Sequence, residues 1–179
     1  MLIAQKKRKE NIAEYILYLY QIEDLIRAFH LDMELINTKL VQSYQVDDST
    51  ASEISKWYEN LVAMMIKEGR QKSSHLQFLY NLVNDLHDFH LRLIADNAEP
   101  SYTVTYQSVA TLLMELKQKN IQAENDVQVA LDGIYGYLLL KIQQKEVSPN
   151  TVQAMKQLSS WLSMLSKHYR DFEKGDLQL

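Results

Sequence analysis

Two polar side chains that fall on apolar helical faces are the first candidates for chemistry. At about 100° per residue along the first predicted helix, Glu23 lies between Ile16 and Leu19 in projection. Arg27 follows at the i,i+4 spacing that lets opposite charges meet. Because an isolated buried carboxylate is very costly, we expect Glu23 to be paired. A buried ion pair that fixes helix register is the favoured interpretation, and a carboxylate facing a ligand pocket is the alternative.

His90 is the second such residue. It projects into the inner apolar face of a helix predicted over 74–95, and His75 lies close to the same face. A histidine in a core is more often a hydrogen-bonded structural residue than a ligand for a metal. We predict that Glu23, Arg27 and His90 form one internal polar cluster between the two helices. The cluster would be either structural or a ligand site.

Other site chemistries find no support in the residues. His87 and His90 are three residues apart, but no histidine has a glutamate three residues before it, as helical di-metal sites require. The chain contains no cysteine and no glycine-rich phosphate loop. The pair Asp47-Asp48 sits in a turn, where capping is the favoured use. We therefore assign no catalytic, cofactor-binding or metal-ligating residue.

The run Lys6-Lys7-Arg8-Lys9 is a cluster of positive charge in a chain whose net charge is -4. Four adjacent residues on a helix point in every direction, so they form no single docking stripe. A solvated helix start is the favoured interpretation, and we do not expect these residues to bind nucleic acid. RNA binding by this basic turn is kept as the weaker alternative function.

The elements that would position these residues are helices, because apolar residues recur at three-and-four spacing almost everywhere. Capping residues mark several ends: Asp32, Ser148 with Pro149, and Thr50 in capping-box spacing to Glu53 predict starts, while Gly69 predicts an end. The β-like stretch 102–106 is interpreted as a loop. The predicted helices cover 3–29, 33–44, 50–69, 74–95, 106–119, 126–145 and 149–175.

The sixth predicted helix is apolar on opposite sides, which is typical of a helix central to its fold. Gly133 and Gly136 lower its helix propensity, and we expect both to let a neighbouring helix approach. The predicted fold is therefore all-α, a compact bundle of six to seven helices with a central apolar sixth helix. We see no linker or repeat, so residues 1–179 are interpreted as a single helical domain.

Three stretches resemble an all-helical bacterial family of unknown function, associated mainly with anaerobic gut bacteria. They are NIAEYILYLYQIEDLIRA (11–28), SHLQFLYNLVNDLHDFHLRLI (74–94) and QAMKQLSSWLSMLSKHY (153–169). The resemblance implies a compact helical fold and a soluble bacterial protein. It implies no activity and no functional residue.

Composition sets the limits of the functional interpretation. A chain of 179 residues with 46% hydrophobic residues can bury a core and is too apolar for intrinsic disorder. No apolar run is long enough to cross a membrane, and a cytoplasmic location is expected. We expect a non-enzymatic helical protein without a cofactor that binds a protein partner or a small molecule, with a homodimer left open. The alternative is an enzyme with a polar pocket around Glu23, Arg27 and His90.

Overall fold

The computed structural model describes residues 2–96, 99–120 and 122–178, and the regular structure within these ranges is entirely helical. This confirms the predicted all-α fold class. The short helix α3 continues into a π-helical turn, Asn37–Val41, and a 3₁₀ turn, Gln42–Tyr44. The α-helices are α1 (Leu2–Glu10), α2 (Ile12–Ala28), α3 (Met33–Ile36), α4 (Asp48–Lys67), α5 (Gln77–Asp96), α6 (Pro100–Lys119), α7 (Asp126–Ile142) and α8 (Pro149–Glu173).

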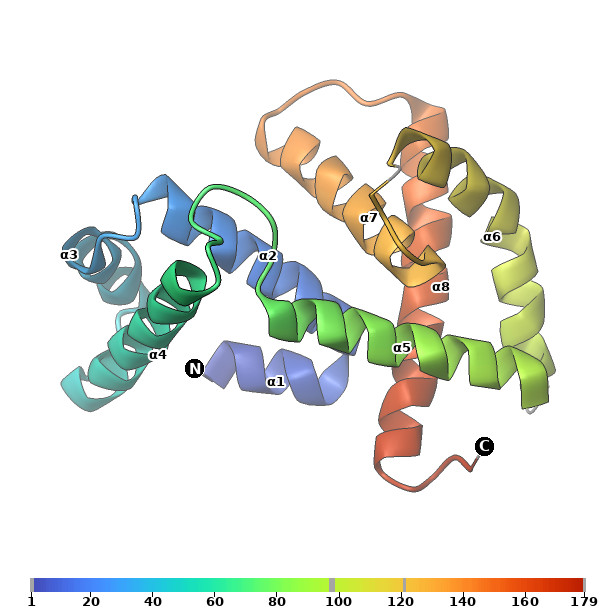
Figure 1. The fold of residues 1–179 in the computed structure, drawn as a ribbon, viewed down its shortest axis with the longest axis horizontal. Coiled ribbons are helices and arrows are strands. Elements are labelled where there is room, and N and C mark those ends of the chain that lie inside the picture. Colours follow the sequence, from blue (N-terminus) through green and yellow to red (C-terminus); the bar gives the residue numbers. More distant parts are fainter. Residues whose placement is uncertain (1, 97–98, 121, 179) are drawn as a thin grey trace.

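The helices form two groups joined by α2 and α5. Helices α3 and α4 lie together at one end of the molecule, and α6, α7 and α8 lie at the other (Figure 1). The long helix α8 packs against α1, α2, α5, α6 and α7. Its Trp161 is fully buried, as are Tyr20 of α2 and Tyr102 of α6. The core therefore runs along α8 and continues beneath α2.

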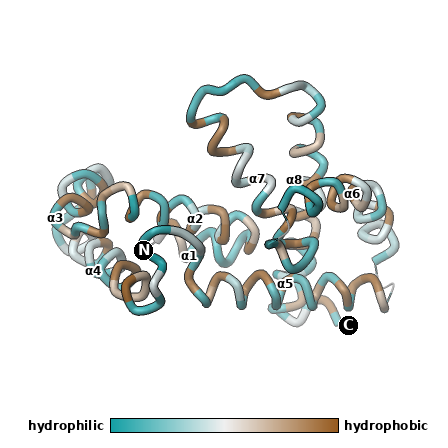
Figure 2. Tube along the Cα trace, turned by 45° about the horizontal axis from the view of Figure 1, so that its top comes forward, coloured by the Kyte–Doolittle hydropathy of each residue, from teal (hydrophilic) through white to brown (hydrophobic). Residues whose placement is uncertain are grey.

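Helix α7 is the predicted apolar sixth helix, and it contacts α2, α5, α6 and α8. Its N-terminal half is buried through Val127, Ala130 and Leu131, whereas Ile142 at its end is 63% exposed. The connection 143–148 that follows lies far from α5 in both views (Figures 1 and 2). The central position thus belongs to the first half of α7.

The predicted helix limits are wrong at Asn11 and at 102–106. The helix expected over 3–29 is divided at Asn11, which is extended at φ −154° and caps α2 by accepting the N–H of Glu14 at 3.1 Å. The loop expected over 102–106 is the first part of α6, which begins at Pro100. Burial of Tyr102 against the core outweighs the local β propensity of this stretch.

Some of the predicted caps are confirmed and others are wrong. Asp32 accepts the N–H groups of Glu34 and Leu35, and Ser148 accepts that of Thr151. Gly69 ends α4 at φ +70°, the left-handed conformation that glycine adopts without strain. Asp47, however, caps α4 in place of Thr50, because its Oδ1 accepts the Thr50 N–H at 3.0 Å. Helix α5 starts at Gln77, so Ser73 and Ser74 belong to the preceding loop.

Gly133 and Gly136 differ in what surrounds them. A Cβ on Gly133 would meet Leu116 Cδ1 of α6 at 3.3 Å, so this glycine does allow close packing. A Cβ on Gly136 would meet nothing within 4 Å. The expected close approach at Gly136 is therefore wrong.

We predict that Gly136→Ala raises the free energy of unfolding by about 0.5–1 kcal/mol, because alanine favours the helix and meets no neighbour. Gly133→Ala is the matched control, and it should raise the free energy of unfolding by less, because the Leu116 side chain must shift to admit the new methyl group. Urea denaturation followed by tryptophan fluorescence measures both variants. A lower urea midpoint for Gly136→Ala than for the parent would contradict this account.

Candidate functional site

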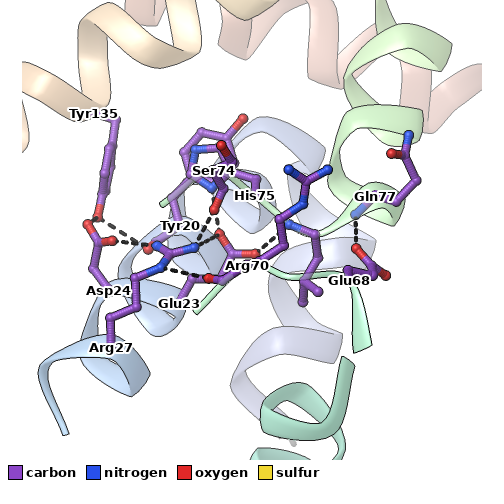
Figure 3. A network of polar contacts seen from close by, with 11 residues as sticks. Tyr20, Glu23, Asp24, Arg27, Glu68, Arg70, Ser74, His75, Gln77 and Tyr135 are labelled. Carbon is purple, nitrogen blue, oxygen red and sulfur yellow. Dashed lines mark hydrogen bonds and ion pairs between the residues drawn. The ribbon is translucent and has the colours of Figure 1, made fainter. Parts of the chain in front are cut away.

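Glu23 is a buried carboxylate on α2, only 1% exposed, and it is held by three groups. Its Oε1 accepts the N–H of Leu76 at 2.8 Å. Its Oε2 lies 2.5 Å from Nδ1 of His75 and 3.9 Å from Nη2 of Arg27. These contacts come from the loop before α5 and from the next turn of α2 (Figure 3). The carboxylate therefore fastens that loop to α2.

The start of α5 explains why a carboxylate is stable there. The first N–H groups of a helix have no partner within the helix, and the macrodipole places partial positive charge on them. Glu23 accepts the Leu76 N–H, and Glu68 Oε2 accepts the Gln77 N–H at 2.7 Å. Glu23 of α2 and Glu68, the residue after α4, thus cap the start of α5.

The side chain of Arg27 binds backbone carbonyls of the same loop. Its Nε donates to the carbonyl of Arg70 at 3.2 Å, and its Nη2 donates to the carbonyl of Ser74. Ser74 has φ +68°, a left-handed conformation uncommon for residues other than glycine. The third arm, Nη1, donates to Asp24 at 2.7 Å. Arg27 thereby holds a strained loop in one conformation.

The ring of His75 is fixed in position. It stacks on Tyr20 with 3.5 Å between centroids and 10° between planes. Its Nδ1 is committed to Glu23, and 19% of the side chain is exposed. Tyr135 closes the other side of Tyr20 in an edge-on contact and donates its hydroxyl to Asp24 at 2.5 Å. The ring atom of His75 that remains available is Nε2.

His75 lines a cleft of about 700 Å³, here called the polar cleft. Its walls are the loop 70–75, α5, Asn120, the segment 122–125 and α7. None of the described lining residues has an aliphatic side chain. The open space beside Gly136 belongs to this cleft. The side-chain amides that line it are Gln77, Asn84, Asn120, Gln122 and Gln128.

The charged groups of the polar cleft have mixed sign. Arg70 lines it together with Glu124 and Asp132. Burial raises the pKa of the Asp132 carboxyl, while the hydrogen bond from Asn120 and the nearby His75 act in the opposite direction. Asn120 donates to Asp132 Oδ2 at 2.9 Å. The cleft is therefore strongly polar without a dominant charge.

His90 has different partners from those the sequence suggested. Its Nδ1 lies 2.6 Å from the Tyr102 hydroxyl, which also accepts the indole N–H of Trp161 at 3.1 Å. Burial, followed by the neighbouring His87, lowers the pKa of His90 to about 4. The neutral imidazole thus accepts a hydrogen bond from the Tyr102 hydroxyl inside the core. The structure brings Glu23 and Arg27 together, and His75 takes the place that was predicted for His90.

The other candidates from the sequence, metal-ligating side chains and the basic run 6–9, form no second site among the described residues. Among the residues that the structure describes, no three or more histidine, aspartate or glutamate side chains are placed to hold a metal ion. Within the basic run, Lys7 pairs with Glu14 at 3.0 Å, and Arg8 donates twice to Glu173, at 2.7 and 2.9 Å. No helix in the described ranges is long and apolar enough to span a bilayer.

Glu23→Ala should lower the free energy of unfolding by about 3–5 kcal/mol, because His75, Arg27 and the Leu76 N–H lose their common partner. Glu23→Gln should cost less, because the amide keeps an acceptor and the volume. Glu14→Ala is the control: its side chain is 59% exposed, and the change should cost less than about 1 kcal/mol. Urea denaturation gives all three values. Equal effects of Glu23→Ala and Glu14→Ala would contradict the role of Glu23.

The low pKa of His90 predicts an acid-sensitive core. Between pH 6.5 and 4, the unfolded state binds a proton that the folded state excludes, so falling pH favours unfolding. The free energy of unfolding should fall by about 2–3 kcal/mol through this group. His87 and Asp126, the other titratable groups beside His90, are the same in the parent and in the variant used as a test. In His90→Phe, stability should fall less over that range in urea titrations. Identical pH slopes for parent and variant would refute the assignment.

The comparisons with known proteins give a family and no activity. Neither the curated proteins nor the solved structures contain a match to this chain. One family model matches residues 1–176, and its description is a domain of unknown function. The family that the three stretches of sequence resemble is thus shown across nearly the whole chain. On this match, the chain belongs to the DUF4924 family.

Proposed function

We propose that this protein binds a small, polar, uncharged molecule rich in hydroxyl groups, and that the polar cleft is its site. The observation that carries the proposal is the cleft itself: about 700 Å³, with a wall of amide, carboxylate, guanidinium and imidazole groups. Binding pockets for small molecules usually measure about 300–1,000 Å³ and are mostly apolar. A cleft of that size without aliphatic lining favours a ligand that hydrogen-bonds along its whole length.

The distribution of charge supports an uncharged ligand. Arg70 is opposed by Asp132 and Glu124, so a phosphate or another multiply charged anion would meet carboxylates as well as the guanidinium. Amide side chains both donate and accept hydrogen bonds, as hydroxyl groups do. The rings of Tyr80 and Tyr135 also line the cleft. They offer apolar surface to the carbon skeleton of a sugar or another polyol.

Several of the polar groups are already oriented by the protein. Gln128 Oε1 accepts the Glu124 N–H at 3.0 Å, and Asn84 Oδ1 accepts from Asn125 at 3.0 Å. In each case the oxygen is engaged, which leaves the amide N–H groups for other acceptors. Preorganised donors reduce the entropy that is lost when a ligand binds. The cleft is thus suited to binding.

The alternatives are less well supported. The enzyme alternative centred on Glu23, Arg27 and His90 loses His90, whose partners lie in a separate buried cluster. RNA binding by the basic run is weakened because Lys7 and Arg8 are engaged by glutamates. A protein partner, a homodimer and a cytoplasmic location remain predictions.

Thermal shift with a panel of neutral mono- and disaccharides and linear polyols tests the proposal, with inorganic phosphate for comparison. At least one neutral compound should raise Tm, as mass action requires of a ligand that binds only the folded state. Gly136→Met should abolish the shift by filling the cleft, whereas Gln157→Met on the exposed face of α8 should preserve it. The proposal fails if no neutral compound shifts Tm, or if the shift persists in Gly136→Met.

A further inference from the structure

We propose that the polar cleft is a hydrolytic site for small uncharged esters, in which His75 Nε2 is the acid–base group and Glu23 positions it. This inference rests on the proposed function, because the esters would bind in the same cleft that is assigned to neutral ligands. Three observations carry it: the Glu23–His75 contact of 2.5 Å, the stacking on Tyr20, and the place of His75 on the cleft wall.

The first observation fixes the state of the imidazole. A carboxylate at Nδ1 favours the tautomer with the proton on that nitrogen, which leaves a lone pair on Nε2. The same carboxylate stabilises the positive charge that the ring acquires when Nε2 takes up a proton. Buried acids orient catalytic histidines in this way on unrelated folds. At 1% exposure, Glu23 is shielded from the water that would weaken its effect.

The stacking removes the motion that an exposed histidine retains. With 10° between the ring planes and 3.5 Å between centroids, the Tyr20 face restricts rotation of the imidazole. Tyr20 is itself fully buried and supported by the edge of Tyr135. Fixed orientation of an acid–base group contributes to rate as well as to binding. The exposed remainder of His75, 19%, lies on the cleft.

A donor for the ester oxygen is present on the same wall. Nε of Arg70 is buried and has no hydrogen-bond partner in the structure, although Arg70 lines the cleft. Because Nε itself is shielded from the cleft, the donors that can reach a bound ester oxygen are the terminal N–H groups of the same guanidinium. Negative charge that develops on a carbonyl oxygen would strengthen that hydrogen bond, which is how oxyanion sites accelerate acyl transfer.

The reaction needs only water as co-reactant. His75 Nε2 accepts a proton from water while the water oxygen forms a bond to the ester carbonyl carbon, and the carbonyl π electrons move to the oxygen beside Arg70. When this tetrahedral adduct collapses, the carbon–oxygen bond to the alcohol breaks. The proton on Nε2 passes to the departing alkoxide. The products are a carboxylic acid and an alcohol, and the imidazole returns to its starting state.

Hydrolysis of p-nitrophenyl acetate by the full chain tests the inference through release of p-nitrophenolate. His75→Gln should lower kcat about 100-fold, the scale of positioned acid–base catalysis, with KM changed less than about twofold. His30→Gln is the matched control, because His30 is exposed and its rate should equal that of the parent. Equal rates in the His75→Gln and His30→Gln variants would overturn the proposal, as would a parent protein no faster than free imidazole.

Glu23→Gln tests the positioning role. The amide keeps the volume and an acceptor for the Leu76 N–H, so the folded protein should retain KM and lose kcat by at least about tenfold. A purely structural role would lower stability and leave kcat of the folded fraction unchanged, and that result would overturn the assignment of Glu23. If neutral compounds still shift Tm but hydrolysis is absent, the catalytic inference fails and the binding function stands. If hydrolysis depends on His75 but no neutral compound binds, the hydroxyl-rich ligand is wrong.

Discussion

A carboxylate that has left water must recover from the protein the hydrogen bonds and compensating charge that water supplied, and Glu23 recovers them from one short loop. The amide of Leu76 and the ring of His75 satisfy its two oxygens, and Arg27 lies beside it. Arg27 in turn binds the carbonyls of Arg70 and Ser74. The loop 68–76 therefore cannot rearrange without leaving a charge unpaired in the core. This constraint makes rigid the wall of the polar cleft that the loop 70–75 forms.

The two histidines that meet buried groups show how environment divides the roles of one residue type. His90 accepts a hydrogen bond from the Tyr102 hydroxyl and is otherwise surrounded by the rings of Tyr106 and Trp161. It is a neutral part of the core, and burial keeps it so. His75 has a carboxylate at one nitrogen and the cleft beside the other. His90 therefore has a structural role, whereas His75 is accessible to a ligand in the polar cleft.

The sequence predicts those features that depend on near neighbours in the chain. Spacings of three or four residues are enough to predict the helical periodicity and the caps at Asp32 and Ser148. The same spacing predicts the pairing of Glu23 with Arg27. The sequence marks His75 only as a residue near the apolar face of the helix predicted over 74–95. Its pairing with Glu23 bridges 52 positions, so no local pattern reports it. Asn120 and Asp132 reach the cleft from a distant segment for the same reason.

The places where local reasoning fails share a cause. The β-like stretch at 102–106 is helical because Tyr102 is buried between His90 and Trp161, partners contributed by α5 and α8. Likewise, the start of α5 is set by Glu23 of α2 and by Glu68, the residue after α4, although serines stand just before it. In both cases tertiary contacts override an intrinsic preference of modest size.

The position of α8 against the first helices has a consequence for biosynthesis. Ser166 accepts the N–H of Ala13 across 153 positions, and Arg8 pairs with Glu173 across 165. On the ribosome, the apolar faces of α1 and α2 are therefore made long before the helix that covers them. Contacts so far apart in the chain also slow folding, because a long loop must close before they form. The native core can be completed only after α8 has been made, and until then the partly synthesised chain exposes apolar surface that favours aggregation.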